Sequence, residues 1–142
     1  MRPGLQITFD ANDVPRLLGF WAETLGYVRQ PPPDGFATWE DFARQRGIPE
    51  DQGDDWGALI HPDGGRPRIF FQRVPEGKTA KNRMHLDLNV GEGPEGEAGT
   101  ERVKEEADRI EALGATRRRE VDERGELWIV MQDPEGNEFC LQ

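Results

Sequence analysis

Three residues in the second half of the chain have side chains that could do chemistry: His85, Glu138 and Cys140. An imidazole can move a proton or bind a metal, a carboxylate can act as a general base, and a thiol can be a nucleophile or a zinc ligand. Glu138 and Cys140 are two residues apart, so on a strand they share a face with their side chains about 7 Å apart. These three residues are the predicted catalytic candidates.

Each candidate also has a purely structural interpretation, and the sequence leaves both open. His85 could be a structural histidine bonded to Asp87 or to a backbone carbonyl. Cys140 could be a small buried filler, because free cysteines often occupy cores. Asp87 is expected to contribute polarity to a pocket or to orient His85 from behind. The other histidine, His61, precedes Pro62 in a turn and is expected to be exposed.

The chain repeats one pattern of elements, and His85 stands at the start of the second copy. Residues 5–10 and 84–90 alternate apolar and polar residues, which predicts two half-buried strands. Each strand leads into a helix that ends at a Leu-Gly pair, and Gln6 and His85 hold matching places. Because duplicated units of this kind usually share a cleft, we expect His85 to lie where a ligand or metal binds.

The remaining elements follow from caps, turns and periodicity. The first helix is expected to begin after Asn12 or Asp13 and to end at Gly26. The helix of the second copy is expected to be capped by Thr100, after a loop over residues 91–99. Further strands are expected at 27–29, 57–60, 68–73, 115–121, 127–132 and 137–142. An extra helix is expected at 37–46. The strand that contains His85 is expected to begin at residue 83.

These elements predict an α+β fold with two β-α-β-β-β modules that form a cupped mixed sheet, with the helices outside. The chain of 142 residues is expected to be a single domain over 1–142. Module one covers about 1–78 and carries a helical insertion at 36–57, and module two covers about 79–142.

Composition limits the classes of function. The formal net charge is −10, which argues against a nucleic-acid binder, and the run Arg117 to Arg119 is followed at once by acidic residues. A single cysteine rules out an internal disulfide. The sequence shows no signal peptide and no apolar run that could span a membrane, so we expect a soluble cytoplasmic protein.

Strand alternation predicts which residues line the site. One face of the sheet is expected to pack against the helices, and the other face is expected to carry a mixed polar and aromatic set. Such a set is typical of a small-molecule cavity. The predicted ligand-binding residues are Gln6, Thr8, Phe70, Gln72, Asp87 and Trp128. Trp39 and Trp56, both placed in the insertion, form either a lid or a separate small cluster.

The closing segment, Asp133-Pro134-Glu135-Gly136-Asn137 and its final strand, resembles that of the vicinal oxygen chelate superfamily. This superfamily includes glyoxalase I, extradiol dioxygenases, and fosfomycin and bleomycin resistance proteins. The segments 71–76, 81–83, 85–88, 39–43 and 47–50 resemble the bacterial glyoxalase-like domain group within it. The resemblance covers essentially the whole chain.

The resemblance implies four positions at which a metal could be bound. In metal-dependent relatives, ligands come from the first and last strands of each module, which places them here at Gln6, His85, Cys140 and either Phe70 or Gln72. Glutamine is an accepted ligand in some glyoxalases, whereas Cys140 stands where the family usually has glutamate. No carboxylate occupies these positions, and Mn²⁺ and Mg²⁺ favour oxygen ligands.

We therefore favour a metal-free protein that binds a small molecule in a cavity around His85. The alternative is a metal-dependent lyase or dioxygenase of the glyoxalase type, with zinc as the first candidate ion, bound by Gln6, His85 and Cys140. The resemblance also implies a homodimer, because paired modules in relatives often associate. If the tryptophans form a lid, residues 36–57 should move when ligand binds.

Overall fold

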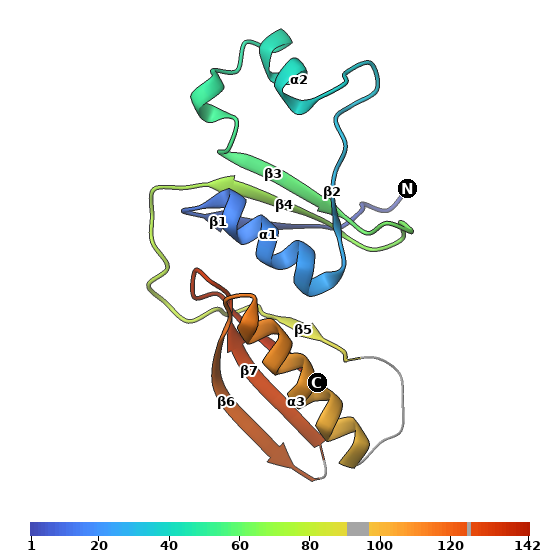
Figure 1. The fold of residues 1–142 in the computed structure, drawn as a ribbon, viewed down its shortest axis with the longest axis vertical. Helices are drawn as coiled ribbons and strands as arrows, with labels where there is room; N and C mark the ends of the chain where they lie inside the picture. Colours follow the sequence, from blue (N-terminus) through green and yellow to red (C-terminus); the bar gives the residue numbers. More distant parts are fainter. Residues whose placement is uncertain (91–96, 125) are drawn as a thin grey trace. The chain divides into compact units, whose positions relative to one another are not determined.

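The computed structural model describes residues 1–90, 97–124 and 126–142 (Figure 1). The chain divides into two compact units, Met1–Gly77 and Lys78–Gln142, which are described separately below. Most of the loop predicted at 91–99 lies outside the described residues. In the part of the chain that is described, no helix is long and apolar enough to cross a membrane.

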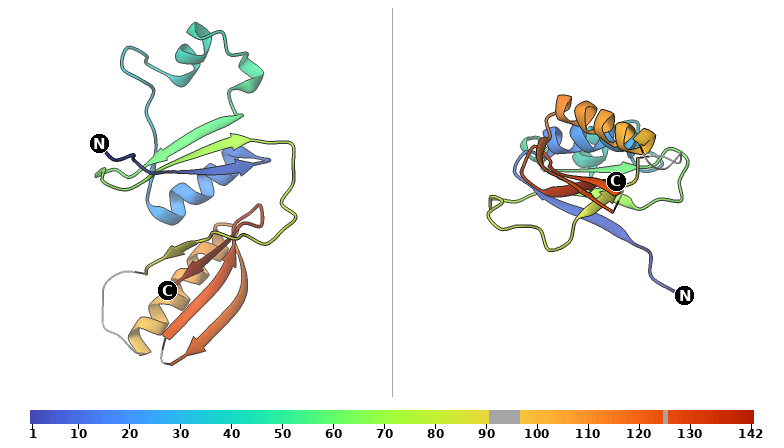
Figure 2. Two further views of the ribbon diagram at one scale, coloured as in Figure 1. Left: turned by 180° about the vertical axis from the view of Figure 1, so that it is seen from behind. Right: turned by 90° about the horizontal axis from the view of Figure 1, so that it is seen from below.

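The first unit is a four-stranded sheet in the order β1-β4-β3-β2, with one helix packed on it. Its strands are β1 (Gln6–Ala11), β2 (Val28–Arg29), β3 (Trp56–Ile60) and β4 (Arg68–Arg73). β1 runs parallel to β4, and the other pairs are antiparallel. Helix α1 (Val14–Leu25) lies along one face of this sheet, as Figure 2 shows from two further directions.

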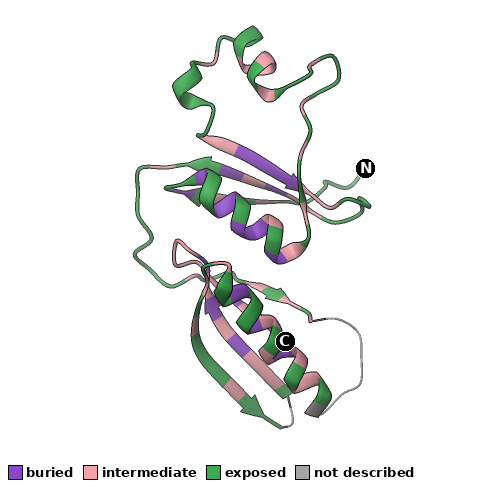
Figure 3. Ribbon diagram, in the orientation of Figure 1, coloured by how far each residue is buried: buried purple, intermediate pink, exposed green. Residues whose placement is uncertain are grey.

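Local sequence sets the ends of α1. The Asp13 side chain accepts a hydrogen bond from the Arg16 N–H at 3.1 Å and so caps the first turn. Gly26 ends the helix with φ of 65°, a left-handed conformation that glycine adopts without steric cost. Both boundaries confirm the prediction. Between them, Leu17 and Trp21 are buried against the sheet, and the rings of Phe9 and Trp21 are tilted by 36° with 5.2 Å between their centroids. Figure 3 shows buried segments alternating with exposed ones along α1.

An insertion separates β2 from β3. It contains α2 (Trp39–Gln45), capped by the Thr38 hydroxyl, and the short 3₁₀ helix η1 (Glu50–Gln52). Gly47 follows α2 with φ of 69°, a left-handed conformation in which glycine commonly ends a helix. The prediction that the insertion runs to residue 57 was wrong by two residues, because Trp56 already pairs with Gln72 in the ladder between β3 and β4.

The second unit repeats the first. Its strands are β5 (Leu86–Leu88), β6 (Thr116–Glu123), β7 (Glu126–Gln132) and β8 (Glu138–Leu141), in the order β5-β8-β7-β6. β5 runs parallel to β8, and helix α3 (Glu97–Ala112) contacts β6 and β7. Val103, Ala107 and Ile110 of this helix are buried. The predicted class, α+β with two β-α-β-β-β modules, is confirmed, and each module forms its own mixed sheet.

Two boundaries in this unit differ from the prediction. β5 begins at Leu86 rather than Arg83, because Asn82 ties down the preceding segment: its side-chain amide donates to the Met84 carbonyl at 3.2 Å. His85 therefore lies immediately before the strand. Helix α3 begins at Glu97, so Thr100 lies inside its first turns and is not its cap.

The turn between β7 and β8 is held by Asp133, which is only 3% exposed. One oxygen of its carboxylate accepts from the N–H groups of Glu135 and Asn137 at 2.9 and 3.0 Å. The other accepts from the Asn137 side-chain amide at 2.8 Å. These bonds fix the point at which β8 starts, and with it the positions of Glu138 and Cys140.

Candidate functional site

The sheet face that does not contact α3 gathers the predicted catalytic candidates of the second unit. Residues directly opposite each other in a ladder share a face, and Asp87 pairs with Cys140, which in turn pairs with Val130. Trp128, two residues before Val130, lies on the same face and is half-buried. The predicted alternation therefore holds within this unit.

His85 and Asp87 form the closest polar contact on this face. The imidazole Nδ1 lies 2.6 Å from the Asp87 carboxylate, and each side chain is a little over 40% exposed. An ionised carboxylate can only accept hydrogen bonds, so Nδ1 is the donor and Nε2 of the neutral ring keeps its lone pair. In the neutral ring, Nε2 can therefore accept a proton or bind an ion.

The Cys140 thiol completes a cluster with this pair. One potential ligand atom from each of His85, Asp87 and Cys140 lies within 4.8 Å of the other two. Burial raises the pKa of the thiol, and the charge of Asp87 and its hydrogen bond with Cys140 raise it further. In the absence of an ion the thiol is therefore protonated at neutral pH, and Cys140 is a poor nucleophile in this state.

Glu138 is held by neighbours on a different segment. Its carboxylate accepts from the Asn82 N–H at 2.9 Å and lies 3.2 Å from the Lys78 ammonium. Burial alone would raise the pKa of this carboxyl, but the backbone N–H groups of Asn82 and Glu138, together with Lys78, hold it below its usual value. The Glu138 carboxylate thus binds groups in residues 78–82, and these contacts compete with a role as a general base.

The two units repeat each other position by position. Ile7 pairs with Ile69 in the first unit, as Leu86 pairs with Phe139 in the second. If Gln6 matches His85, then Cys140 matches Phe70, one residue further along each last strand. The same register aligns Gln72 with Gln142. The side-chain amide of Gln72 donates to Asp10 at 2.8 Å, and that of Gln142 donates to Asn89 at 3.1 Å. The sequence left open whether Phe70 or Gln72 matches Cys140, and the register assigns Phe70.

In the first unit, Arg68 organises the matching face. Its guanidinium donates to Gln6 Oε1 at 2.6 Å and to Gln30 Oε1 at 2.5 Å, and it lies 5.2 Å from the centroid of the Phe70 ring. Thr8, which pairs with Phe70, accepts from the Gln6 amide at 3.3 Å. Sequence reasoning missed Arg68. The available signal was its place two residues before Phe70, which puts both side chains on one face.

The tryptophans divide between sheet and insertion. Trp56 is on β3 and matches Trp128 of β7 by the register above, whereas Trp39 begins α2. The indoles of Trp39 and Trp56 meet edge to face with centroids 4.9 Å apart. Whether Trp39 moves with a ligand stays a prediction.

His61 is not exposed as expected. Its side chain is 16% exposed, packs edge-on against Tyr27 and accepts a hydrogen bond from the Asp63 N–H.

These features lead to a family. A sequence model of the glyoxalase-like domain matches residues 6–142. The chain belongs to the glyoxalase-like domain family. A comparison with curated protein sequences found no significant match. The match to the family model confirms the resemblance to the vicinal oxygen chelate fold that the motifs indicated.

Solved structures share the fold of this glyoxalase-like domain at low identity. The E126Q mutant of the fosfomycin resistance protein FosX from Listeria monocytogenes, in complex with Mn(II) and 1S,2S-dihydroxypropylphosphonic acid, is 16% identical with a TM-score of 0.65. The alignment covers 100% of this chain and 90% of that one. A glyoxalase/bleomycin resistance protein/dioxygenase family enzyme from Burkholderia phytofirmans is 16% identical with a TM-score of 0.62, covering 96% and 94% of the two chains.

The residues of this glyoxalase-like domain do not fit a Mn(II) site. Of the four positions implied by the family, Phe70 has no ligand atom and Cys140 offers sulfur, so Gln6 is the single oxygen donor among them. Mn²⁺ prefers several oxygen ligands. The donors that do lie together are an imidazole, a carboxylate and a thiol, which are ligands that zinc accepts.

Proposed function

We propose that this glyoxalase-like domain binds a small, oxygen-bearing molecule at a site built around His85, and that it does so without a resident metal. The observation that carries the proposal is the 2.6 Å contact between His85 Nδ1 and Asp87, because a neutral ring that donates from Nδ1 to this carboxylate presents Nε2 as an acceptor. Nε2 is then an acceptor for a ligand hydroxyl. The neutral Cys140 thiol and the Trp128 indole supply less polar walls on the same face.

The chemistry open to such a site is binding and proton transfer. A ligand hydroxyl can donate to His85 Nε2, and Asp87 stabilises the imidazolium that forms if the proton moves. Glu138 is proposed to act through position, because its ties to Lys78 and Asn82 hold the segment that leads to His85. FosX binds a dihydroxypropylphosphonic acid in this fold, which supports small vicinally oxygenated compounds as the first class to test.

A second candidate is a zinc-dependent enzyme of the glyoxalase type. Potential ligand atoms of His85, Asp87 and Cys140 all lie within 4.8 Å of one another, which favours this candidate, and these three residues would hold the ion. Bound zinc would polarise a substrate oxygen or lower the pKa of a bound water. The zinc ligands predicted from the sequence were Gln6, His85 and Cys140. The cluster in the structure contains Asp87 in place of Gln6, which belongs to the first unit.

A ligand screen separates the two candidates. The probes are small vicinal diols, hydroxy acids and catechols, including 1S,2S-dihydroxypropylphosphonic acid, and binding is measured by NMR shifts. We expect saturable binding that His85→Ala abolishes, that His61→Ala (the matched change at the other histidine) preserves, and that EDTA does not affect. Binding that EDTA abolishes and zinc restores would establish the second candidate instead. If no probe bound in a His85-dependent way, the proposal would be wrong.

A further inference from the structure

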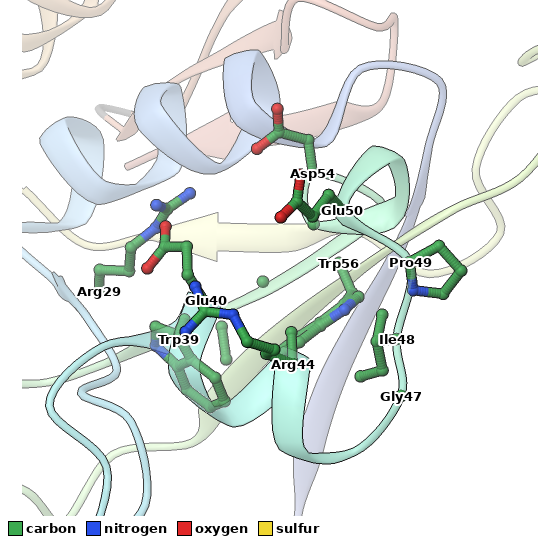
Figure 4. Close-up of a pocket in the computed structure, with 14 residues that line it drawn as sticks. Arg29, Trp39, Glu40, Arg44, Gly47, Ile48, Pro49, Glu50, Asp54 and Trp56 are labelled. Carbon is green, nitrogen blue, oxygen red and sulfur yellow. The ribbon is translucent and has the colours of Figure 1, made fainter.

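A pocket of about 690 Å³ lies in the first unit, between the insertion and strands β2 and β3 (Figure 4). Small-molecule sites usually fall between about 300 and 1,000 Å³. Every residue that lines this pocket lies between Arg29 and Ala58, so it is complete within one unit and contains none of the residues around His85. The second unit has no corresponding insertion between its second and third strands.

The apolar part of the pocket is an aromatic corner formed by Trp39 and Trp56. Their ring planes meet at 84° with centroids 4.9 Å apart. Trp39 is held in place because its Nε1–H donates to the Gln30 carbonyl at 2.8 Å and its ring packs against Phe42 at 5.5 Å. Trp56 is held by its strand. Ile48 extends the apolar lining. A ligand would therefore meet walls that are already in place, which lowers the entropy cost of binding.

The charged part of the lining is mainly acidic. It contains Glu40, Glu50 and Asp54, against Arg29 and Arg44. Arg44 is already paired with Asp41, outside the lining, at 3.1 Å. Within the described residues, no ion pair involves Glu50 or Asp54, and both are exposed. Figure 4 shows these two carboxylates on one side of the pocket, across from Trp39 and Arg44.

We propose that this pocket binds a small organic cation that has an aromatic or apolar body. The ammonium group would lie by Glu50 and Asp54, and the body would fill the corner between the two indoles. Indole rings favour an aromatic or apolar body through burial and ring contacts, and the net charge of −10 raises the local concentration of cations and disfavours anions. None of the residues that line this pocket belongs to the site proposed around His85, so the two proposals rest on different residues.

Three probes of similar shape but different charge test the proposal: 2-phenylethylamine, 2-phenylethanol and phenylacetate. Binding is followed through the indole N–H resonances in NMR titrations, assigned with single Trp→Phe variants. We expect the amine to shift the signals of Trp39 and Trp56 and to leave those of Trp21 and Trp128 in place. The amine should bind about tenfold more tightly than the alcohol, with the acid weakest.

Two double variants test whether the carboxylates of Glu50 and Asp54 bind the ammonium group. Glu50→Gln with Asp54→Asn should bring the affinity for the amine down to that for the alcohol. The control, Asp63→Asn with Glu76→Gln, removes the same charge from exposed positions outside the lining and should leave the preference unchanged. His85→Ala should also leave binding of the amine unchanged, which keeps this test independent of the proposed function. Equal affinity for amine and alcohol, tightest binding of the acid, shifts centred on Trp128, or no saturable shift would each overturn the proposal.

Discussion

Replacing Asp87 by asparagine should make Cys140 more reactive. The Asp87 carboxylate lies within 4.8 Å of the thiol and hydrogen-bonds to it. After burial, this charge and this bond are the main causes that raise the pKa of Cys140. Asn has nearly the same shape and no charge, so the substitution removes the repulsion that opposes the thiolate. The pKa of Cys140 should fall, and alkylation should begin at a lower pH.

The size of the effect follows from the distance and the exposure. At 4.8 Å, the upper limit of the separation between the two groups, two unit charges interact by about 0.9 kcal/mol in the dielectric of water and by about 3.5 kcal/mol at an effective dielectric of 20. The Asp87 side chain is 42% exposed, so the lower value applies. Removing an interaction of about 0.9 kcal/mol makes the thiolate fraction of Cys140 below its pKa about fourfold larger in Asp87→Asn than in wild type. Because a less basic thiolate is a weaker nucleophile, the alkylation rate there should rise only about twofold.

The assay is the rate of iodoacetamide alkylation between about pH 6 and 10, followed by mass spectrometry. Cys140 is the only cysteine, so the modification reports one site. The control is Asp63→Asn, which changes the carboxylate beside the other histidine and should leave the profile unchanged. An unchanged midpoint in Asp87→Asn, or an equal shift in Asp63→Asn, would refute the reasoning about this cluster.

Three further predictions concern the second unit and the assembly. Because the pKa of Glu138 is lowered, its carboxylate stabilises the fold above the usual value of 4.5, and this stabilisation is lost as the pH falls through the lower folded pKa. Urea unfolding of wild type and Glu138→Gln should thus differ most near neutral pH and converge in acid. Asp133→Ala leaves three buried or half-buried donors without their acceptor and should lower the free energy of unfolding by about 3 kcal/mol, whereas a loss below about 1 kcal/mol would contradict the role of the turn. The resemblance to the superfamily predicts a homodimer, and light scattering that shows a 16.1 kDa monomer at every concentration from micromolar to millimolar would exclude it.

The sequence predicted those parts of the fold that depend on local chemistry. The cap at Asp13, the left-handed stop at Gly26 and the strand Arg68–Arg73 all follow from residues within a few positions of the boundary. The start of β5 did not, because it is set by bonds from Asn82 to Met84 and to Glu138, and Glu138 lies 56 residues further along the chain. The start of α3 was missed because a Gly- and Glu-rich stretch favours a loop by composition.

For the site, the sequence predicted which residues share a face but not how they pair. Alternation placed Asp87, Cys140 and Trp128 together, whereas the match between Phe70 and Cys140 needed the registers of two ladders. The hydrogen bonds of Arg68 to Gln6 and Gln30, and the pocket beside the insertion, depend on side-chain geometry across strands, which the sequence alone does not give. Asp87 was seen as a partner of His85, and its distance from the thiol adds it to the possible ligands.

The most direct test of the account is the metal content of the purified protein. Elemental analysis should be made on wild type and His85→Ala, both prepared without chelators and without metal-affinity steps. Because Phe70 and Cys140 occupy two of the four ligand positions implied by the family, we predict far less than one manganese, nickel or magnesium ion per chain in both proteins. Manganese or nickel near one ion per chain in wild type, lost in His85→Ala, would contradict the metal-free site and establish a metal-dependent enzyme of the glyoxalase type.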